Sequence, residues 1–195
     1  MDGSTPDPAV FLHVRVAIGM VVGLAIASVL SGVARFVQHP KRHKPDWIHL
    51  AWALAMLLSL VHFWWWEYWL TVVTWRFEFY LFVISFAILY YFMCALLFPS
   101  DINEYRDWRE YFMSRRRWFF ILWAVAIVFD ATDTLLKGRA HFESFGIEYP
   151  IQIGVYLVLA GVAAWTPNRR FHAAFAAGNL LYQLSWILRR FDVLA

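Results

Sequence analysis

The chain has 195 residues, of which 62% are hydrophobic and 16% are charged, and its mean hydropathy is +0.53. This composition excludes an ordinary soluble domain and is typical of a helical protein that crosses a membrane several times. The net charge of +3 does not indicate a nucleic-acid partner, because Lys and Arg gather between the apolar runs, as membrane topology requires.

The single cysteine and the first residues of the chain indicate no further chemistry. Cys94 is the only cysteine and lies in an apolar run, so we expect neither an intrachain disulfide nor a thiolate metal site. The first residues, MDGSTPDP, lack the basic start of a signal peptide, and the apolar run that follows is too long for one. We therefore expect the first hydrophobic segment to be retained as a membrane span.

A helix needs about 20 mostly apolar residues to cross about 30 Å of hydrocarbon. Prolines stand at the edges of the apolar runs and indicate where each helix ends, because a proline does least harm near a helix end. The sequence predicts an all-α bundle of about six transmembrane helices, forming a single integral membrane domain over residues 1–195. The predicted spans are Val10–Ala34, Trp47–Trp66, Phe77–Phe98, Trp118–Leu136, Ile151–Trp165 and Phe171–Leu188.

The stretch 61–80, VHFWWWEYWLTVVTWRFEFY, joins the second and third spans. Indole rings settle at the level of the lipid headgroups, where the ring stays dry and the N–H finds a polar partner. We interpret this stretch as a turn at the membrane interface, with Glu67, Arg76 and Glu78 at the water boundary.

Between the third and fourth spans, residues 101–114 alternate apolar and polar side chains at helical spacing. Asp101 followed by Glu104 resembles a capping box, and Arg115 begins a basic run where a helix would end. We expect an amphipathic helix on the membrane surface; a simple connecting loop is the alternative.

The distribution of basic residues predicts the orientation. Eleven of the 17 Lys and Arg residues follow the first, third and fifth spans, and an excess of basic residues marks cytoplasmic loops. We expect both termini outside the cytoplasm of a prokaryotic cell, with the chain in its inner membrane. Arg189 and Arg190 depart from this pattern and are interpreted as reaching outward from the end of the last span.

Small residues recur every four positions in the first span, at Gly19, Gly23, Ala27 and Ser31. Such a stripe lets another helix approach closely. We favour packing within the chain, and keep a homo-oligomer or protein partner on the Gly19, Gly23 and Ala27 face as the alternative.

Polar residues within or bordering the spans, among them Tyr149, Gln152 and Tyr182, concentrate in the outer half of the predicted bundle. Asp130 and Asp133 share a helix face, with Lys137 one turn further on, so Lys137 and water account for Asp133. Asp130 lies deeper, where a carboxylate costs at least about 2.5–3.5 kcal/mol. It is either a working acid or structural, paired with Arg15, His62 or Asn179. The predicted ligand- or ion-binding residues are Asp130, Asp133, His62, Gln183, Asn179, Arg15 and Glu67.

Histidines permit one further interpretation. His13 and His62 fall at the outer level, and His49 and His172 at the inner level, as a b-type haem protein would require. Positions near span ends explain most of these residues without a cofactor, so we expect no haem, and the spacing of His, Asp and Glu predicts no metal site.

The sequence contains no phosphate-binding loop, serine nucleophile motif or HExxH motif, and we expect a protein that is not an enzyme. The leading hypothesis is a small multi-pass protein whose outer polar pocket binds or conducts a proton, a cation or a small polar solute. The alternatives are a non-catalytic membrane subunit that holds a partner or lipid, and a haem redox protein.

Overall fold

The structure is a computed structural model that describes residues 8–39, 44–67 and 75–190. These ranges form seven α-helices and contain no strand. The helices are α1 (Pro8–Gln38), α2 (Trp47–Trp66), α3 (Phe77–Leu97), α4 (Trp108–Leu136), α5 (Arg139–Glu143), α6 (Glu148–Trp165) and α7 (Arg169–Arg190).

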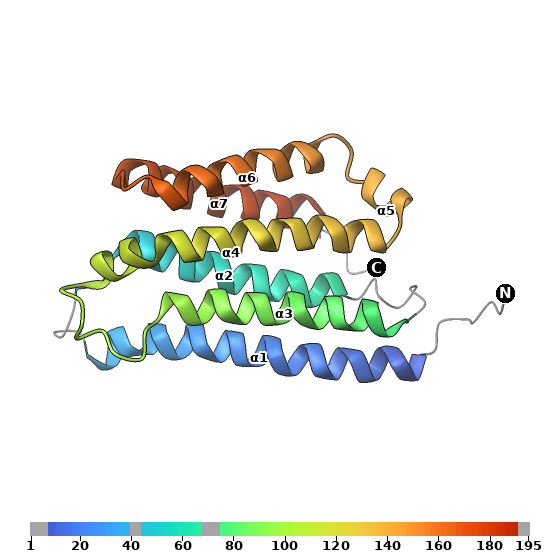
Figure 1. Cartoon of the computed structure of the whole chain (residues 1–195), viewed down its shortest axis with the longest axis horizontal. Coiled ribbons are helices and arrows are strands. Elements are labelled where there is room, and N and C mark those ends of the chain that lie inside the picture. Colours follow the sequence, from blue (N-terminus) through green and yellow to red (C-terminus); the bar gives the residue numbers. More distant parts are fainter. Residues whose placement is uncertain (1–7, 40–43, 68–74, 191–195) are drawn as a thin grey trace.

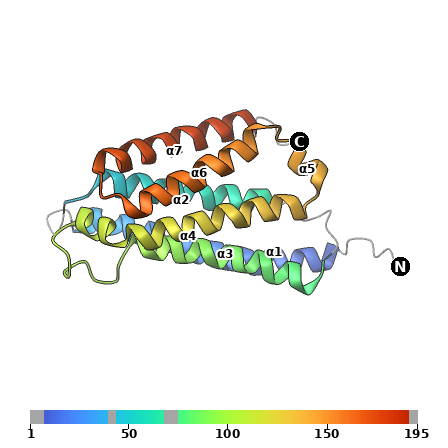
Figure 2. The ribbon, with the colours of Figure 1, turned by 45° about the horizontal axis from the view of Figure 1, so that its top comes forward.

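The six long helices lie side by side along one axis and alternate in direction (Figures 1 and 2). Helices α1, α3, α4 and α6 follow one another as neighbours, and α2 packs against α1, α3, α4 and α7. Helix α6 packs mainly on α4, whereas α7 packs mainly on α2, and α6 and α7 make few contacts with each other.

Five of the described helices, α1, α2, α3, α4 and α6, are long and apolar enough to span a membrane. These features are those of an integral membrane protein with a helical bundle, as the composition predicts. Helix α7 forms where the sixth span was predicted and runs the length of α6 (Figure 1), but it is not among the five. Its mid-helix Asn179 and Gln183 make it less apolar.

The two ends of the bundle differ in character. Helix α1 begins and α7 ends at one end, which we call the terminal end (right in Figure 1). The opposite end carries the segments 98–107 and 166–168 and the basic run that begins at Arg115; we call it the basic end.

Aspartates define two helix starts at the basic end. The carboxylate of Asp46 accepts from the backbone N–H of His49 at 3.3 Å, and that of Asp107 accepts from the N–H of Glu110 at 2.8 Å. These bonds satisfy N–H groups that have no partner within the helix.

The cap at Asp107 corrects one prediction. Helix α4 begins at Trp108 and continues without a break to Leu136, so residues 101–114 do not form a separate surface helix. Residues 101–107 are non-helical, and the capping pattern repeats at Asp107 and Glu110, where it starts the long helix instead. The predicted fourth span is thereby extended at its N-terminal side.

Aromatic rings fill the bundle core. Trp52 is 1% exposed and meets the rings of Phe119, Phe120, Trp123 and Phe175 edge to face, at centroid distances of 5.1 to 5.5 Å. Edge-to-face contacts of this kind stabilise beyond simple burial. Much of the high aromatic content therefore holds helices together.

The small-residue stripe on α1 does not hold the helices of this chain together. Gly23, Ala27 and Ser31 are exposed on α1, so packing within the chain is the wrong interpretation of these positions. The close approach occurs instead at buried Gly32, where an added Cβ would collide with the ring of Phe98. An oligomer through the Gly19, Gly23 and Ala27 face stays a prediction.

Candidate functional site

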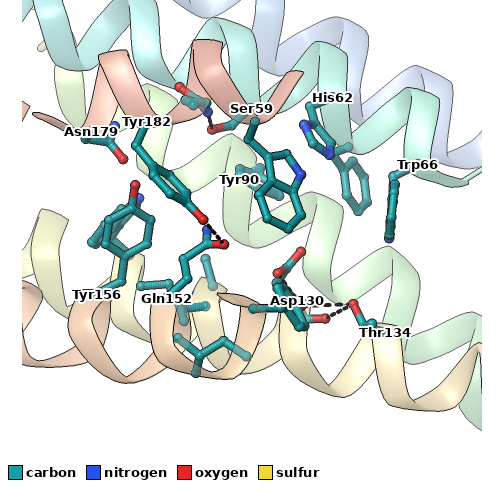
Figure 3. Close-up of a pocket in the computed structure, with 18 of the residues that line it drawn as sticks. Ser59, His62, Trp66, Tyr90, Asp130, Thr134, Gln152, Tyr156, Asn179 and Tyr182 are labelled. Carbon is teal, nitrogen blue, oxygen red and sulfur yellow. Dashed lines mark hydrogen bonds between the residues drawn. The ribbon is translucent and has the colours of Figure 1, made fainter. Parts of the chain in front are cut away.

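A cavity of about 150 Å³ lies toward the terminal end, between the α4–α6 and α2–α7 pairs (Figure 3). Its wall combines many aromatic rings with a small number of polar side chains. The polar lining residues are Ser59, His62, Asp130, Thr134, Gln152, Asn179 and Gln183; the aromatic ones are Phe63, Trp66, Phe86, Tyr90, Trp123, Phe145, Tyr149, Tyr156, Tyr182 and Trp186.

Asp130 is the carboxylate in this wall. The hydroxyl of Tyr149 donates to Asp130 Oδ2 at 2.7 Å, and the hydroxyl of Thr134 lies 2.9 Å from that of Tyr149. The uncharged Tyr149 therefore orients the carboxyl group, while the Thr134 hydroxyl donates to the backbone carbonyl of Asp130. Within the described part of the chain, no cation forms an ion pair with Asp130, and its Oδ1 has no hydrogen bond. The carboxylate is therefore held in place without being neutralised.

Helix α7 supplies the polar groups on the opposite wall. Gln183 donates to the hydroxyl of Ser59 at 2.6 Å and so joins α7 to α2, while its own Oε1 is buried without a partner among the described residues. The hydroxyl of Tyr182 lies 3.0 Å from Gln152 Oε1 (Figure 3). It also lies 3.1 Å from Glu148 Oε1. Hydrogen bonds thus brace the cavity across three helices.

A second group of charges lies beside the cavity, toward the terminal end. Lys137 Nζ is 2.5 Å from Asp133 Oδ2 and 3.4 Å from Glu67 Oε1, and the three side chains are between 1% and 5% exposed. We call Glu67, Asp133 and Lys137 the ion cluster. Its Lys137 also lies 5.7 Å from the ring centroid of Trp66, a residue of the cavity wall.

The ion cluster has two carboxylates for one ammonium group. Glu67 Oε2 and Asp133 Oδ1 are buried and have no hydrogen-bond partner among the described residues. Burial, and next the Asp133 carboxylate, raise the pKa of Glu67 to about 8, although Lys137 opposes this shift. A proton on Glu67 would balance the charge of the cluster, which is the direction of this shift.

The structure brings four of the predicted site residues together on the cavity wall: Asp130, His62, Asn179 and Gln183. Asp133 and Glu67 lie in the ion cluster instead. Two expectations about their surroundings are wrong: Asp133 is not near water, and Glu67 is buried rather than at the water boundary. That these residues bind a ligand or ion stays a prediction.

Arg15 does not pair with Asp130. It is exposed on α1, with its guanidinium carbon 4.7 Å from the ring centroid of Trp64. Arg76 and Glu78 are exposed beside each other, as expected of a water boundary. The predicted interface turn falls on residues 68–74, which lie outside the described residues.

Sequence reasoning placed Tyr149, Gln152 and Tyr182 in the same half of the bundle without assigning them to the site. Ser59 and Thr134 were missed, because hydroxyl side chains are common in helices and carry no signal of their own. The aromatic wall was also missed, since its rings come from five helices and form no pattern in the sequence.

The inner histidines have structural partners. The Nε2 of His49 donates to the carbonyl of Leu97 at 2.7 Å, and that of His172 to the carbonyl of Thr166 at 2.9 Å. His13 is exposed near the start of α1. No group of three His, Cys, Asp or Glu side chains that could hold a metal ion occurs in the described ranges. The expectation of no haem stays a prediction.

Comparison with known proteins identifies no relative: no family model matches the chain, and no curated protein or solved structure matches it.

Proposed function

We propose that this multi-pass protein binds a small polar solute in the cavity, with the carboxylate of Asp130 as the main polar contact. The observation that carries the proposal is an oriented carboxylate without a counterion on the wall of a cavity of about 150 Å³. An ionisable group inside a membrane bundle is costly and marks a functional site by default. Ligand pockets typically combine apolar walls with a few convergent polar groups, as here.

The proposed orientation has the basic end in the cytoplasm of a prokaryotic cell, α7 as the sixth span, and both termini outside. The cavity then lies in the outer half of the bundle. A reporter fused after Lys44 should behave as cytoplasmic, and one fused at Ser144, between α5 and α6, as external. The opposite pattern would place the cavity in the inner half.

Binding can be tested by filling the cavity. Ala126 belongs to its wall, so Ala126→Leu should reduce the space, whereas Ala27→Leu adds the same atoms to an exposed position on α1. Thermal stability of the purified full-length protein would be measured with increasing millimolar concentrations of choline, ethanolamine and acetamide, which at these concentrations act neither as denaturants nor as excluded osmolytes. A ligand that binds only the folded state adds about 2.7 kcal/mol when its concentration is 100 times its Kd.

We expect at least one of these solutes to stabilise the wild type and Ala27→Leu, and to have a much smaller effect on Ala126→Leu. Transition temperatures that no solute changes would contradict solute binding and favour the scaffold hypothesis. A solute that stabilises all three proteins equally would bind outside the cavity and would also contradict the proposal.

A further inference from the structure

We infer that the solute bound in the cavity is a small organic ammonium ion, held between the Asp130 carboxylate and the faces of the surrounding aromatic rings. This inference rests on the proposed function and specifies its ligand class. It draws on four features of the cavity: the continuity of its aromatic wall, its unbalanced charge, the scarcity of oxygen ligands, and its size.

The aromatic wall is continuous. Ring centroids follow one another from Trp123 to Tyr156 at 5.0 Å, from Tyr156 to Tyr182 at 5.9 Å, from Tyr182 to Trp186 at 6.1 Å, and from Trp186 to Tyr149 at 6.4 Å. The last ring carries the hydroxyl that holds Asp130. Faces of such rings attract cations, and several rings together form the cages that recognise organic ammonium groups.

The Asp130 carboxylate has no counterion among the described residues, because the nearby cations pair with other carboxylates. Lys137 is engaged by Asp133 and Glu67, and Arg189 forms two hydrogen bonds with Glu148 at 2.9 and 2.6 Å. Arg139, at the start of α5, pairs with Glu143 at 2.9 Å, so all three of these cations serve other carboxylates. A ligand with one positive charge would provide the counterion that Asp130 lacks.

The other lining groups disfavour an inorganic cation. A bare metal ion must exchange its hydration shell for several oxygen ligands. Asp130 is the one carboxylate among the described lining residues, and most of the wall is hydrocarbon and ring surface. An alkylated ammonium ion is weakly hydrated and matches both parts of this wall.

The volume limits the size of the ligand. A cavity of about 150 Å³ corresponds to one known to hold benzene, so a tetramethylammonium or choline ion is of suitable size. The acyl chains of a lipid exceed this volume, so a whole lipid does not fit inside it. The inference therefore concerns a compact ion and not a membrane lipid as a whole.

The ligand class can be tested with choline and its uncharged analogue 3,3-dimethylbutan-1-ol, in which carbon replaces nitrogen. Trp66, Trp123 and Trp186 line the cavity, so binding to the full-length protein in nanodiscs should change its tryptophan fluorescence. We expect saturable binding of choline, at least about tenfold weaker binding of the analogue, and no displacement of choline by equimolar potassium, since ring faces and one carboxylate together prefer the organic cation.

Two variant pairs identify the groups responsible. Asp130→Asn keeps the shape of the side chain and should weaken choline at least about tenfold while leaving the analogue unchanged; Asp101→Asn removes an exposed carboxylate and should change neither. Tyr182→Phe keeps the ring and should retain choline binding within about threefold, whereas Tyr182→Leu should weaken it further. If Asp130→Asn does not fold, two measurements still test the ligand class: the affinities of the wild type for choline and its analogue, and the choline affinities of the two Tyr182 variants.

The outcomes separate this inference from the proposed function. Equal affinity for choline and its analogue would overturn the ammonium ligand and leave a neutral solute in the cavity. Saturable, Asp130-dependent binding of potassium in preference to choline would also overturn it. If neither probe binds and no solute distinguishes Ala126→Leu from Ala27→Leu, the proposed function fails as well.

Discussion

Asp130 and Asp133 lie almost one turn apart on α4, yet they belong to different kinds of region. Asp133 is 1% exposed and ion-paired with Lys137, whereas Asp130 is bonded to the uncharged Tyr149 and faces the cavity. One helix therefore carries a carboxylate that is neutralised within the protein and another that is not. The partner of each group, rather than its residue type or depth, distinguishes a structural carboxylate from one available to a ligand.

The largest expected effect comes from removing the cation of the ion cluster. Lys137→Met leaves the Asp133 carboxylate buried without its counterion and should destabilise the protein by about 3–5 kcal/mol. Unfolding in detergent would be compared with Arg139→Met, which breaks an exposed pair with Glu143 and should cost at most about 1 kcal/mol. Equal stability losses would show that the ion cluster is hydrated and would remove the contrast with Asp130.

A smaller effect is expected from removing the hydroxyl that positions Asp130. Tyr149→Phe keeps the ring in the aromatic wall but deletes the donor to Asp130 Oδ2, which should cost about 1.5–3 kcal/mol because the acceptor is charged. The same change at exposed Tyr91 should remain within about 0.5 kcal/mol and serves as the control. A neutral result at Tyr149 would mean that Asp130 has another partner.

The pH dependence of folding stability tests the protonation of Glu67 in the ion cluster. The pKa of Glu67 is raised from 4.5 to about 8 by burial first and then by Asp133. The folded protein thus holds a proton that the unfolded chain releases between these values. Stability from this group is fully present below pH 4.5 and is lost as the pH rises toward about 8.

The transition temperature of the wild type should therefore fall over this pH range relative to that of Glu67→Gln, which cannot ionise. The two proteins share every other titratable group, so the difference between their profiles reports Glu67. Parallel profiles would contradict a protonated Glu67.

The smallest effect is expected at Arg15, which was a predicted partner of Asp130. Because Arg15 is exposed and contacts the Trp64 ring, Arg15→Gln should cost only about 0.5–1 kcal/mol and leave choline affinity unchanged. The unfolding and fluorescence titrations described above measure both quantities. A loss of affinity would place Arg15 in the site after all.

Most of the fold could be predicted from the sequence because apolar length is a strong constraint in membranes. The second predicted span, Trp47–Trp66, coincides with α2. Helix starts were less predictable, since the D-x-x-E pattern occurs at Asp101 and at Asp107 and only the second caps a helix. The sequence does not say which of two equivalent local signals is used.

The candidate site could be predicted only in outline. Depth along the spans placed Asp130, His62, Asn179 and Gln183 in one half of the bundle, and the structure brings them to one cavity. Partners on different helices could not be predicted, because their pairing depends on helix rotation and packing. Tyr149 was recognised as polar, but no local spacing identifies it as the donor to Asp130.

The most direct test of this account measures stability and choline affinity together in Asp130→Asn and Asp133→Asn. Asp130→Asn should retain the wild-type stability within about 1 kcal/mol, because asparagine still accepts the bond from Tyr149, and should lose choline affinity. Asp133→Asn should lose about 1–3 kcal/mol of stability, because Lys137 loses its 2.5 Å partner and keeps only its longer contact with Glu67, and its folded fraction should bind choline as the wild type does. Two variants that lose stability and affinity to the same extent would contradict the division between the cavity and the ion cluster.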